Sequence, residues 1–171
     1  MLKVVSFDPS LSNWGIAYCS YTPNYLSIDK VSIIQTKPLK KSKLSKSLQD
    51  MSRILTLHEG VLKAIEDCDV VVAELPTGSQ SARAMMSYGV CLALVTAIDK
   101  PLITVTPSQV KKVVGAHTTS KEEIIDWVNF NHPNVLDKAK TRSEHQADAV
   151  VAIYAAKDQL KAFYAEFTAT Q

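Results

Sequence analysis

The chain has 171 residues and a formal net charge of +2, from 19 Lys and Arg against 17 Asp and Glu. Apolar residues make up 46% and charged residues 21%, which is ordinary globular usage and excludes a disordered tail, a collagen-like rod and a disulfide-rich miniprotein. The length predicts one domain over residues 1–171. Because the net charge is small, composition alone gives no sign of a nucleic-acid partner.

The cysteines and the apolar segments bear on the compartment. Cys19, Cys68 and Cys91 lie among apolar residues and form no C-x-x-C pair, so we expect free thiols and no structural zinc. Free thiols fit a reducing cytosol. The apolar run at the N-terminus is too short for a signal peptide, and no stretch reaches the ~20 apolar residues of a membrane span. We therefore expect a cytoplasmic protein with no membrane partner.

The first third of the chain predicts three consecutive strands. Residues 2–7 form an almost unbroken apolar run, which is typical of a strand buried on both faces, and residues 8–13 have the composition of a turn. Further strands are predicted over residues 14–19 and 26–35. The three opening strands are expected to be antiparallel neighbours.

The middle of the chain alternates helices and strands. After the lysine-rich segment 37–46, apolar residues at steps of three and four predict an amphipathic helix. The predicted stripe comprises residues 44, 48, 51, 55, 58, 62 and 65. Residues 70–73 then predict a buried strand, residues 80–98 a helix with several small residues, and residues 102–105 a fifth strand.

Three capping-box patterns mark the helices of the last third. They predict helices from Thr106 to about Val114, from Ser120 through Trp127, and from Ser143 to about Phe167. The resulting order is βββ-α-β-α-β-α-α-α. It predicts an α/β fold with a mixed five-stranded sheet, made of three antiparallel strands and then parallel βα units, with helices on both faces.

Three carboxylates and one histidine stand where a site at the sheet edge would need them. Asp8 follows the first strand and Glu74 ends the fourth, while the final helix carries His145 and Asp148 three positions apart, on one helix face. If the first and fourth strands are parallel neighbours, the carboxylates share one end of the sheet, and such an oxygen-rich site suits Mg²⁺ or Mn²⁺. Taken singly, each residue has another explanation. Asp8 is also typical of a turn, and Glu74 is typical of a charge at the protein surface. His145 and Asp148 are also typical of residues that interact favourably with the helix dipole.

Several segments, in this order along the chain, resemble the RuvC-type Holliday junction resolvases of the RNase H-like, retroviral-integrase superfamily. The resemblance covers nearly the whole chain. Residues 7–15 are similar to the D-P-G-x-x-x-x-G turn of the family, and residues 106–115 to its P-x-Q-V-K segment. The other matching segments are residues 72–74, 120–123 and 145–149. The short single-domain form looks more like resolvases encoded by bacteriophages.

The resemblance implies an RNase H-like fold and hydrolysis of phosphodiester bonds with two Mg²⁺ ions per site, for which Mn²⁺ would substitute. Asp8 would bridge the ions and Glu74 would hold one of them. Asp148 and His145 would hold the other or orient the attacking water, with a general-base role for His145 as the alternative. Paired nicks with 5′-phosphate ends in four-way junctions and other branched DNA would follow. Because two opposed nicks need two sites, a homodimer is expected, with the helix over residues 80–98 as its candidate interface.

Candidate DNA contacts lie in two regions. The resemblance implies phosphate contacts by Lys111 and Lys121, and Lys112 adjoins the first of them. Small or polar residues between the fourth strand and the next helix are candidates for the junction centre, namely Thr77, Ser79, Gln80 and Arg83. The structural alternative for each lysine is a solvated surface position. The lysine-rich segment 37–46 either touches the duplex arms or serves solubility alone.

The chain departs from the family pattern at two places. Ser10 stands where the family carries Gly, and no aromatic residue lies between Glu74 and Arg83, where the bacterial enzymes carry a wedge. The second departure predicts a relaxed sequence preference at the cut, because base discrimination needs side chains that reach or stack on bases. Two other functions remain as alternatives: a YqgF-like nuclease of related fold acting on RNA, and a branched-DNA-binding protein without catalysis.

Overall fold

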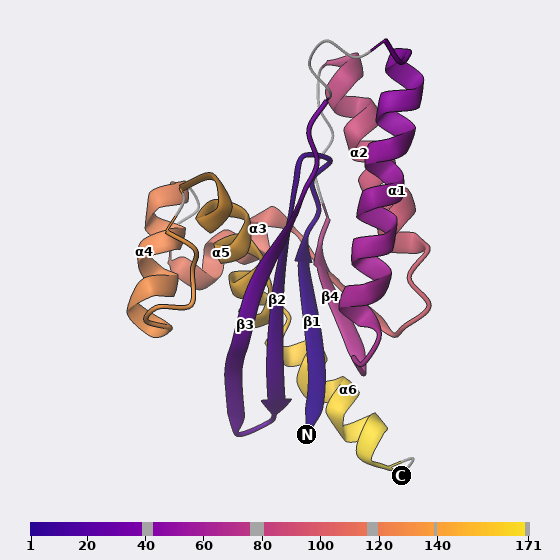
Figure 1. Ribbon diagram of the computed structural model, residues 1–171. Helices are drawn as coiled ribbons and strands as arrows, with labels where there is room; N and C mark the ends of the chain where they lie inside the picture. Colours follow the sequence, from indigo (N-terminus) through magenta and orange to yellow (C-terminus); the bar gives the residue numbers. More distant parts are fainter. Residues whose placement is uncertain (39–42, 76–80, 116–119, 139, 170–171) are drawn as a thin grey trace.

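A computed structural model describes residues 1–38, 43–75, 81–115, 120–138 and 140–169. Its centre is a five-stranded sheet with the strand order β3-β2-β1-β4-β5 (Figure 1). The strands are β1 (Leu2–Asp8), β2 (Asn13–Thr22), β3 (Tyr25–Gln35), β4 (Val70–Glu74) and β5 (Leu102–Val105).

Helices cover both faces of the sheet (Figure 1). They are α1 (Lys46–Ile65), α2 (Ala82–Thr96), α3 (Pro107–Val114), α4 (Lys121–Asn131), α5 (Lys140–Ala155) and α6 (Lys157–Ala169). The helices α1 and α2 lie on one face, whereas α5 lies across the other with α3 and α4 packed against it. No helix in these described ranges is both long and apolar enough to span a membrane.

The central strand β1 sets the polarity of the sheet. It runs antiparallel to β2 and parallel to β4, with Val4 opposite Val70 and Phe7 opposite Ala73. The strand β5 continues the parallel half beyond β4. The predicted α/β class, with three antiparallel strands followed by parallel βα units, is confirmed.

Side-chain alternation divides the strands between two cores. In β1, Leu2 and Val4 pack in the core beneath α5, whereas Val5 and Phe7 pack in the core beneath α1 and α2. All four side chains are buried. The unbroken apolar run of β1 is therefore explained by burial on both faces of the sheet.

Most of the apolar stripe that identifies α1 in the sequence is exposed, and of its residues within the helix Ile65 is the one that is buried. Leu48, Met51, Leu55 and Leu62 are 46–53% exposed. The buried face carries Leu57, Val61, Ala64 and Ile65 toward its end and the charged pair Asp50 and Arg53 toward its beginning. One side of α1 thus presents a row of apolar side chains to solvent.

Two of the three predicted capping boxes are confirmed, at Thr106 and at Ser120. The third is wrong, because α5 begins at Lys140 and Ser143 is a buried residue within the helix. The final helix is also interrupted at Ala156, which separates α5 from α6. Backbone hydrogen bonds run into and out of Ala156, and neither glycine nor proline marks the interruption.

Candidate active site

Alternation along β1 and β4 directs two carboxylates to the same face of the sheet. Asp8 lies on the same face of β1 as Leu2 and Val4. Glu74 lies on the same face of β4 as Val70 and Val72. These four apolar residues pack beneath α5. Because the two strands are parallel neighbours, their carboxyl ends meet at one edge. Asp8 and Glu74 therefore lie at that edge, on the side covered by α5, as the sequence predicts.

The helix α5 brings the other two predicted residues to this edge. Nδ1 of His145 lies 2.5 Å from Oδ2 of Asp8, and both side chains are about one-fifth exposed, at 21% and 17%. The close approach depends on Gly15, which pairs with Asp8 in the sheet. A Cβ at Gly15 would lie 2.5 Å from the carbonyl carbon of His145.

A pocket of about 160 Å³ opens between the acidic residues and the next two helices. Its charged lining is Glu74 and Asp148 on one side and Lys111 and Lys121 on the other, and its remaining lining residues are Pro107, Val110 and Ile124. Nζ of Lys121 also lies 2.9 Å from Oε2 of Glu144. The helix α3 thus delivers Lys111, and the first turn of α4 delivers Lys121, to the acidic edge.

Burial and nearby negative charge raise the pKa of Glu74 and of Asp148. Burial raises the pKa of Glu74 to about 8, with further contributions from the negative charges of Asp8 and Asp148 and an opposing one from Lys111. Burial and the Asp8 charge likewise raise the pKa of Asp148 to about 7. Both carboxylates are therefore costly to ionise without a nearby cation.

The pKa of His145 is raised because nearby negative charge favours its protonated form. Burial by itself lowers the pKa of His145, but the hydrogen bond to Asp8 and the charges of Asp8 and Asp148 outweigh it. A protonated imidazole here neutralises part of the negative charge at the edge. The tautomer and charge of His145 are consequently tied to the state of Asp8.

The donor set fits a hard divalent cation. Oε2 of Glu74 is buried and has no hydrogen-bond partner, so one carboxylate oxygen is left for a ligand that is not protein. Oxygen donors with one imidazole suit Mg²⁺ or Mn²⁺. In the described part of the chain no three Asp, Glu, His or Cys side chains form a ready-made metal cage, so the carboxylates would have to close on an ion.

The other predicted DNA contacts divide into three groups. Lys111 and Lys121 border the acidic pocket, and Lys112 is exposed beside them. Arg83 is engaged within the protein, where Nη1 and Nη2 donate to the two carboxylate oxygens of Asp50 at 2.8 and 2.9 Å. Thr77, Ser79 and Gln80 lie outside the described residues, as does part of the lysine-rich segment 37–46.

Sequence reasoning missed the partners that hold this site together. Glu144 precedes His145 directly, and its place beside the motif is a signal that could have suggested a contact with a nearby lysine. The role of Gly15 depends on the approach of α5. No local signal indicates Asp50, whose partner Arg83 is far along the chain.

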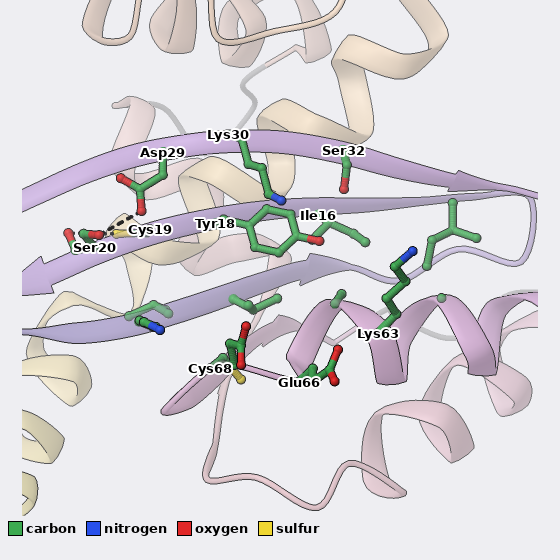
Figure 2. Close-up of a pocket in the computed structure, with 17 residues that line it drawn as sticks. Ile16, Tyr18, Cys19, Ser20, Asp29, Lys30, Ser32, Lys63, Glu66 and Cys68 are labelled. Carbon is green, nitrogen blue, oxygen red and sulfur yellow. Dashed lines mark hydrogen bonds between the residues drawn. The ribbon is translucent and has the colours of Figure 1, made fainter.

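A second pocket, of about 560 Å³, lies away from the acidic edge (Figure 2). It is bounded by the sheet face of β1 to β3 and by the end of α1, and Nζ of Lys30 lies 4.3 Å from the centre of the Tyr18 ring within it. Its charged lining residues are Lys3, Lys30 and Lys63 together with Asp29, Glu66 and Asp67. Because these charges balance, the pocket favours neither anions nor cations.

Comparison with solved structures identifies the architecture. The chain superimposes on Thermus thermophilus RuvC in complex with a Holliday junction substrate with a TM-score of 0.72 and 17% sequence identity, covering 96% of this chain and 98% of that one. This is the RuvC fold. A second Thermus thermophilus RuvC structure matches with a TM-score of 0.63 and 16% identity, covering 94% and 98% of the two chains.

The fold of this chain is also similar to that of a viral resolvase. The Fowlpox virus resolvase in complex with Holliday junction DNA matches with a TM-score of 0.54 and 16% identity, covering 93% of this chain and 99% of that chain. No family model and no curated protein matches the sequence. The likeness therefore rests on the three-dimensional arrangement of the RuvC fold over nearly the whole chain.

Proposed function

We propose that this protein is a metal-dependent endodeoxyribonuclease that resolves four-way DNA junctions by paired nicks leaving 5′-phosphate ends. The observation that carries the proposal is the meeting of Asp8, Glu74 and Asp148 at one edge of the sheet, where burial and mutual repulsion raise the pKa of the last two. Support comes from two solved structures of the same fold that are complexes with Holliday junction substrates.

Each acidic residue has a distinct role in this proposal. Asp8 lies at the end of the central strand, with Glu74 on the neighbouring strand and Asp148 on the covering helix, so it would share the ions with both. Two bound Mg²⁺ ions would supply charge stabilisation to the attacking and leaving oxygens. Nδ1 of His145 is hydrogen-bonded to Asp8, and His145 would orient the attacking water or, in its neutral form, act as general base.

Lysines at the pocket would receive the DNA backbone. Lys111 lines the pocket opposite Glu74 and Asp148, and Lys121 lies at the beginning of α4, where the helix terminus adds partial positive charge. A phosphate placed between these lysines and the acidic edge would be held close to the carboxylates. The scissile phosphate is therefore proposed to enter through this pocket.

The proposed homodimer has a candidate surface on α1. The exposed apolar row of Leu48, Met51, Leu55 and Leu62 lies on one side of a single helix, and such a patch is typical of a protein interface. On the same face of the sheet, α2 exposes Gly89, where an added Cβ would meet open space. A second copy of this chain would cover the α1 row and supply the second active site.

Cleavage of defined substrates tests the proposal. Synthetic four-way junctions, forks, linear duplex and structured RNA would be incubated with Mg²⁺ or EDTA, and the products would be mapped at single-nucleotide resolution. We expect Mg²⁺-dependent paired nicks in junctions with linear duplex spared. Cleavage of RNA in place of junctions would favour the RNA nuclease, and tight junction binding without cleavage would favour a non-catalytic binding protein.

A further inference from the structure

We propose that Asp50 is a positioning residue that ties the turn after Asp8 to the start of α2. The turn is linked to the carboxylate of Asp50 through Arg53, and the start of α2 is linked to it through Arg83. The inference depends on the proposed nuclease function only in the experiments that measure cleavage. It assigns a role to Arg83 that differs from a DNA contact.

The first link runs through Arg53 to the turn after Asp8. Nη2 of Arg53 donates to the carbonyl oxygen of Leu11 at 3.3 Å and to Oγ of Ser12 at 3.0 Å. Nε of Arg53 donates to Oγ1 of Thr36 at 3.1 Å, and the amide of Thr36 donates to the carbonyl oxygen of Ser12 at 3.0 Å. The turn is thus held against the end of β3 by the Arg53 guanidinium together with direct hydrogen bonds from Thr36.

The second link runs through Arg83 to the start of α2. The guanidinium of Arg83 meets the carboxylate of Asp50 with two parallel bonds, at 2.8 and 2.9 Å. Bidentate pairs of this kind restrict geometry as well as adding binding energy. Ser81 is the N-cap of α2, two residues before Arg83, so the beginning of α2 is fixed against α1.

Asp50 joins the two links in a largely dry environment. The side chains of Asp50 and Arg53 are 10% and 6% exposed, and Nη1 of Arg53 lies 3.5 Å from Oδ1 of Asp50. The Arg83 hydrogen bond holds the pKa of Asp50 below its usual range. A buried charge cluster is a weak source of stability, because desolvation offsets much of its attraction. Restriction of geometry is therefore the better explanation for its presence on the buried face of α1.

The consequence is a fixed position for the turn after Asp8. Asp8 ends β1, and the turn leads from it into β2. If either link is broken, Arg53 loses a fixed carboxylate partner and the turn after Asp8 gains freedom at the edge where the ions would bind. Misplacement of a reacting group by ~1 Å can cost about 100-fold in rate.

The first experiment compares Asp50→Asn with Glu59→Gln, which neutralises an exposed carboxylate on the same helix. Single-turnover cleavage of a four-way junction, the Kd for that junction in EDTA, and the Mg²⁺ concentration for half-maximal rate are measured. We expect Asp50→Asn to cleave at least about tenfold more slowly and to need more Mg²⁺, with an unchanged Kd. Glu59→Gln should match the wild type in all three. A merely structural defect would lower the active fraction without changing the Mg²⁺ requirement.

The second experiment uses Arg83, because loss of the Asp50 charge leaves Arg53 buried without its charged partner and so threatens the fold. Arg83 is the exposed end of the network, with 45% of its side chain accessible. Arg83→Gln should slow cleavage and raise the Mg²⁺ requirement, and Arg83→Lys should restore part of the rate because it keeps the charge. The salt dependence of junction binding should stay unchanged in both variants, since no phosphate contact is lost.

Hydrogen exchange separates this inference from the nuclease proposal. In Arg83→Gln the amides of residues 83–86 should exchange faster, and in Asp50→Asn those of residues 10–12 as well, whatever the substrate. Unchanged hydrogen exchange in a folded Asp50→Asn protein would overturn the inference. It would also be overturned if both variants had the Mg²⁺ requirement of the wild type, or if junction binding by Arg83→Gln depended less steeply on salt. Failure of the wild-type protein to cleave junctions would instead reject the nuclease function and leave the exchange result to decide the role of Asp50.

Discussion

The backbone of His145 occupies the space that a side chain on Gly15 would need. Gly15 is paired with Asp8 in the sheet, and a Cβ added to it would lie 2.5 Å from the carbonyl carbon of His145 and 3.0 Å from its Cβ. This absence of a side chain lets α5 approach β2 closely enough for the imidazole to meet the carboxylate of Asp8. The glycine is therefore part of the site although it carries no functional group.

Replacement of Gly15 by Ala should displace the start of α5. We expect a loss of stability of about 1–3 kcal/mol, as for other overpacked cores, and a strong loss of cleavage. Thermal unfolding and single-turnover cleavage measure the two effects. Gly89→Ala is the matched control for the stability measurement, because a Cβ there meets nothing within 4 Å of the single chain and alanine favours a helix by about 1 kcal/mol. Wild-type cleavage by Gly15→Ala would mean that the position of His145 is not needed.

Asp8→Asn should abolish cleavage while leaving junction binding largely intact. An amide keeps the shape of the carboxylate but not the charge that would attract two cations, and we expect a loss of at least about 100-fold in rate, of the size seen for single electrostatic groups in active sites. Cleavage and electrophoretic binding assays on the same junction provide the measurement. Asp126→Asn removes an exposed carboxylate from α4 and should behave as the wild type. Near-normal turnover by Asp8→Asn in Mg²⁺ would exclude its proposed role.

Stability without metal should fall as the pH rises. The pKa of Glu74 is raised from 4.5 to about 8, so between these values the folded state binds more protons than the unfolded state. The free energy of unfolding therefore decreases from about pH 4.5 to about pH 8. Glu74→Gln removes this loss, and in EDTA at pH 8 it should unfold about 2–4 °C higher than the wild type for each kcal/mol recovered.

The pH effect is measured by thermal unfolding in EDTA across this range. The advantage of Glu74→Gln should shrink toward pH 5, where the wild-type carboxyl is protonated in the folded state. Glu59→Gln, at an exposed position on α1, should keep the wild-type pH dependence. Added Mg²⁺ should raise the wild-type melting temperature more at pH 8 than at pH 5. A wild-type stability that is flat in EDTA would contradict the buried, repelling carboxylates.

Lys111→Ala and Lys121→Ala should weaken junction binding and make it less dependent on salt. Each lost phosphate contact lowers the slope of log affinity against log salt by about 0.9 for duplex DNA. Titrations of a labelled junction at several salt concentrations give this slope. Lys161→Ala, on the exposed side of α6, is the control and should leave the slope unchanged. Identical slopes in all proteins would show that the two lysines are ordinary surface residues.

Leu55→Glu should separate the proposed dimer. Leu55 is 51% exposed within the α1 row, so the substitution should not affect the fold of the single chain, but a charge in an interface would weaken association by roughly 30-fold or more. Sedimentation at a series of concentrations measures the change. Phe130→Glu, at an 85% exposed position on α4, should leave association as in the wild type. If the wild-type protein is a monomer, the α1 row does not form a dimer interface, and paired nicks cannot be explained by it.

The amino-acid sequence by itself determined the strands and the positions of the acidic residues. The apolar runs that end at Asp8 and Glu74 are local properties of the sequence. The capping boxes at Thr106 and Ser120 are local properties as well. A helix with His145 and Asp148 on one face follows equally from spacing. These features are read from neighbouring residues, whose preferences for strand, turn or cap do not depend on distant contacts.

Only the tertiary structure decided which faces and partners these elements use. The apolar row of α1 reads as a core face in the sequence, yet the helix buries Asp50 and Arg53 in its first half, because their charges meet Arg83 and the turn after Asp8. Likewise, Gly15 leaves no room for a side chain only because α5 lies against β2. Such roles depend on residues that are far apart along the chain and come together only on folding, and for that reason no local pattern could reveal them.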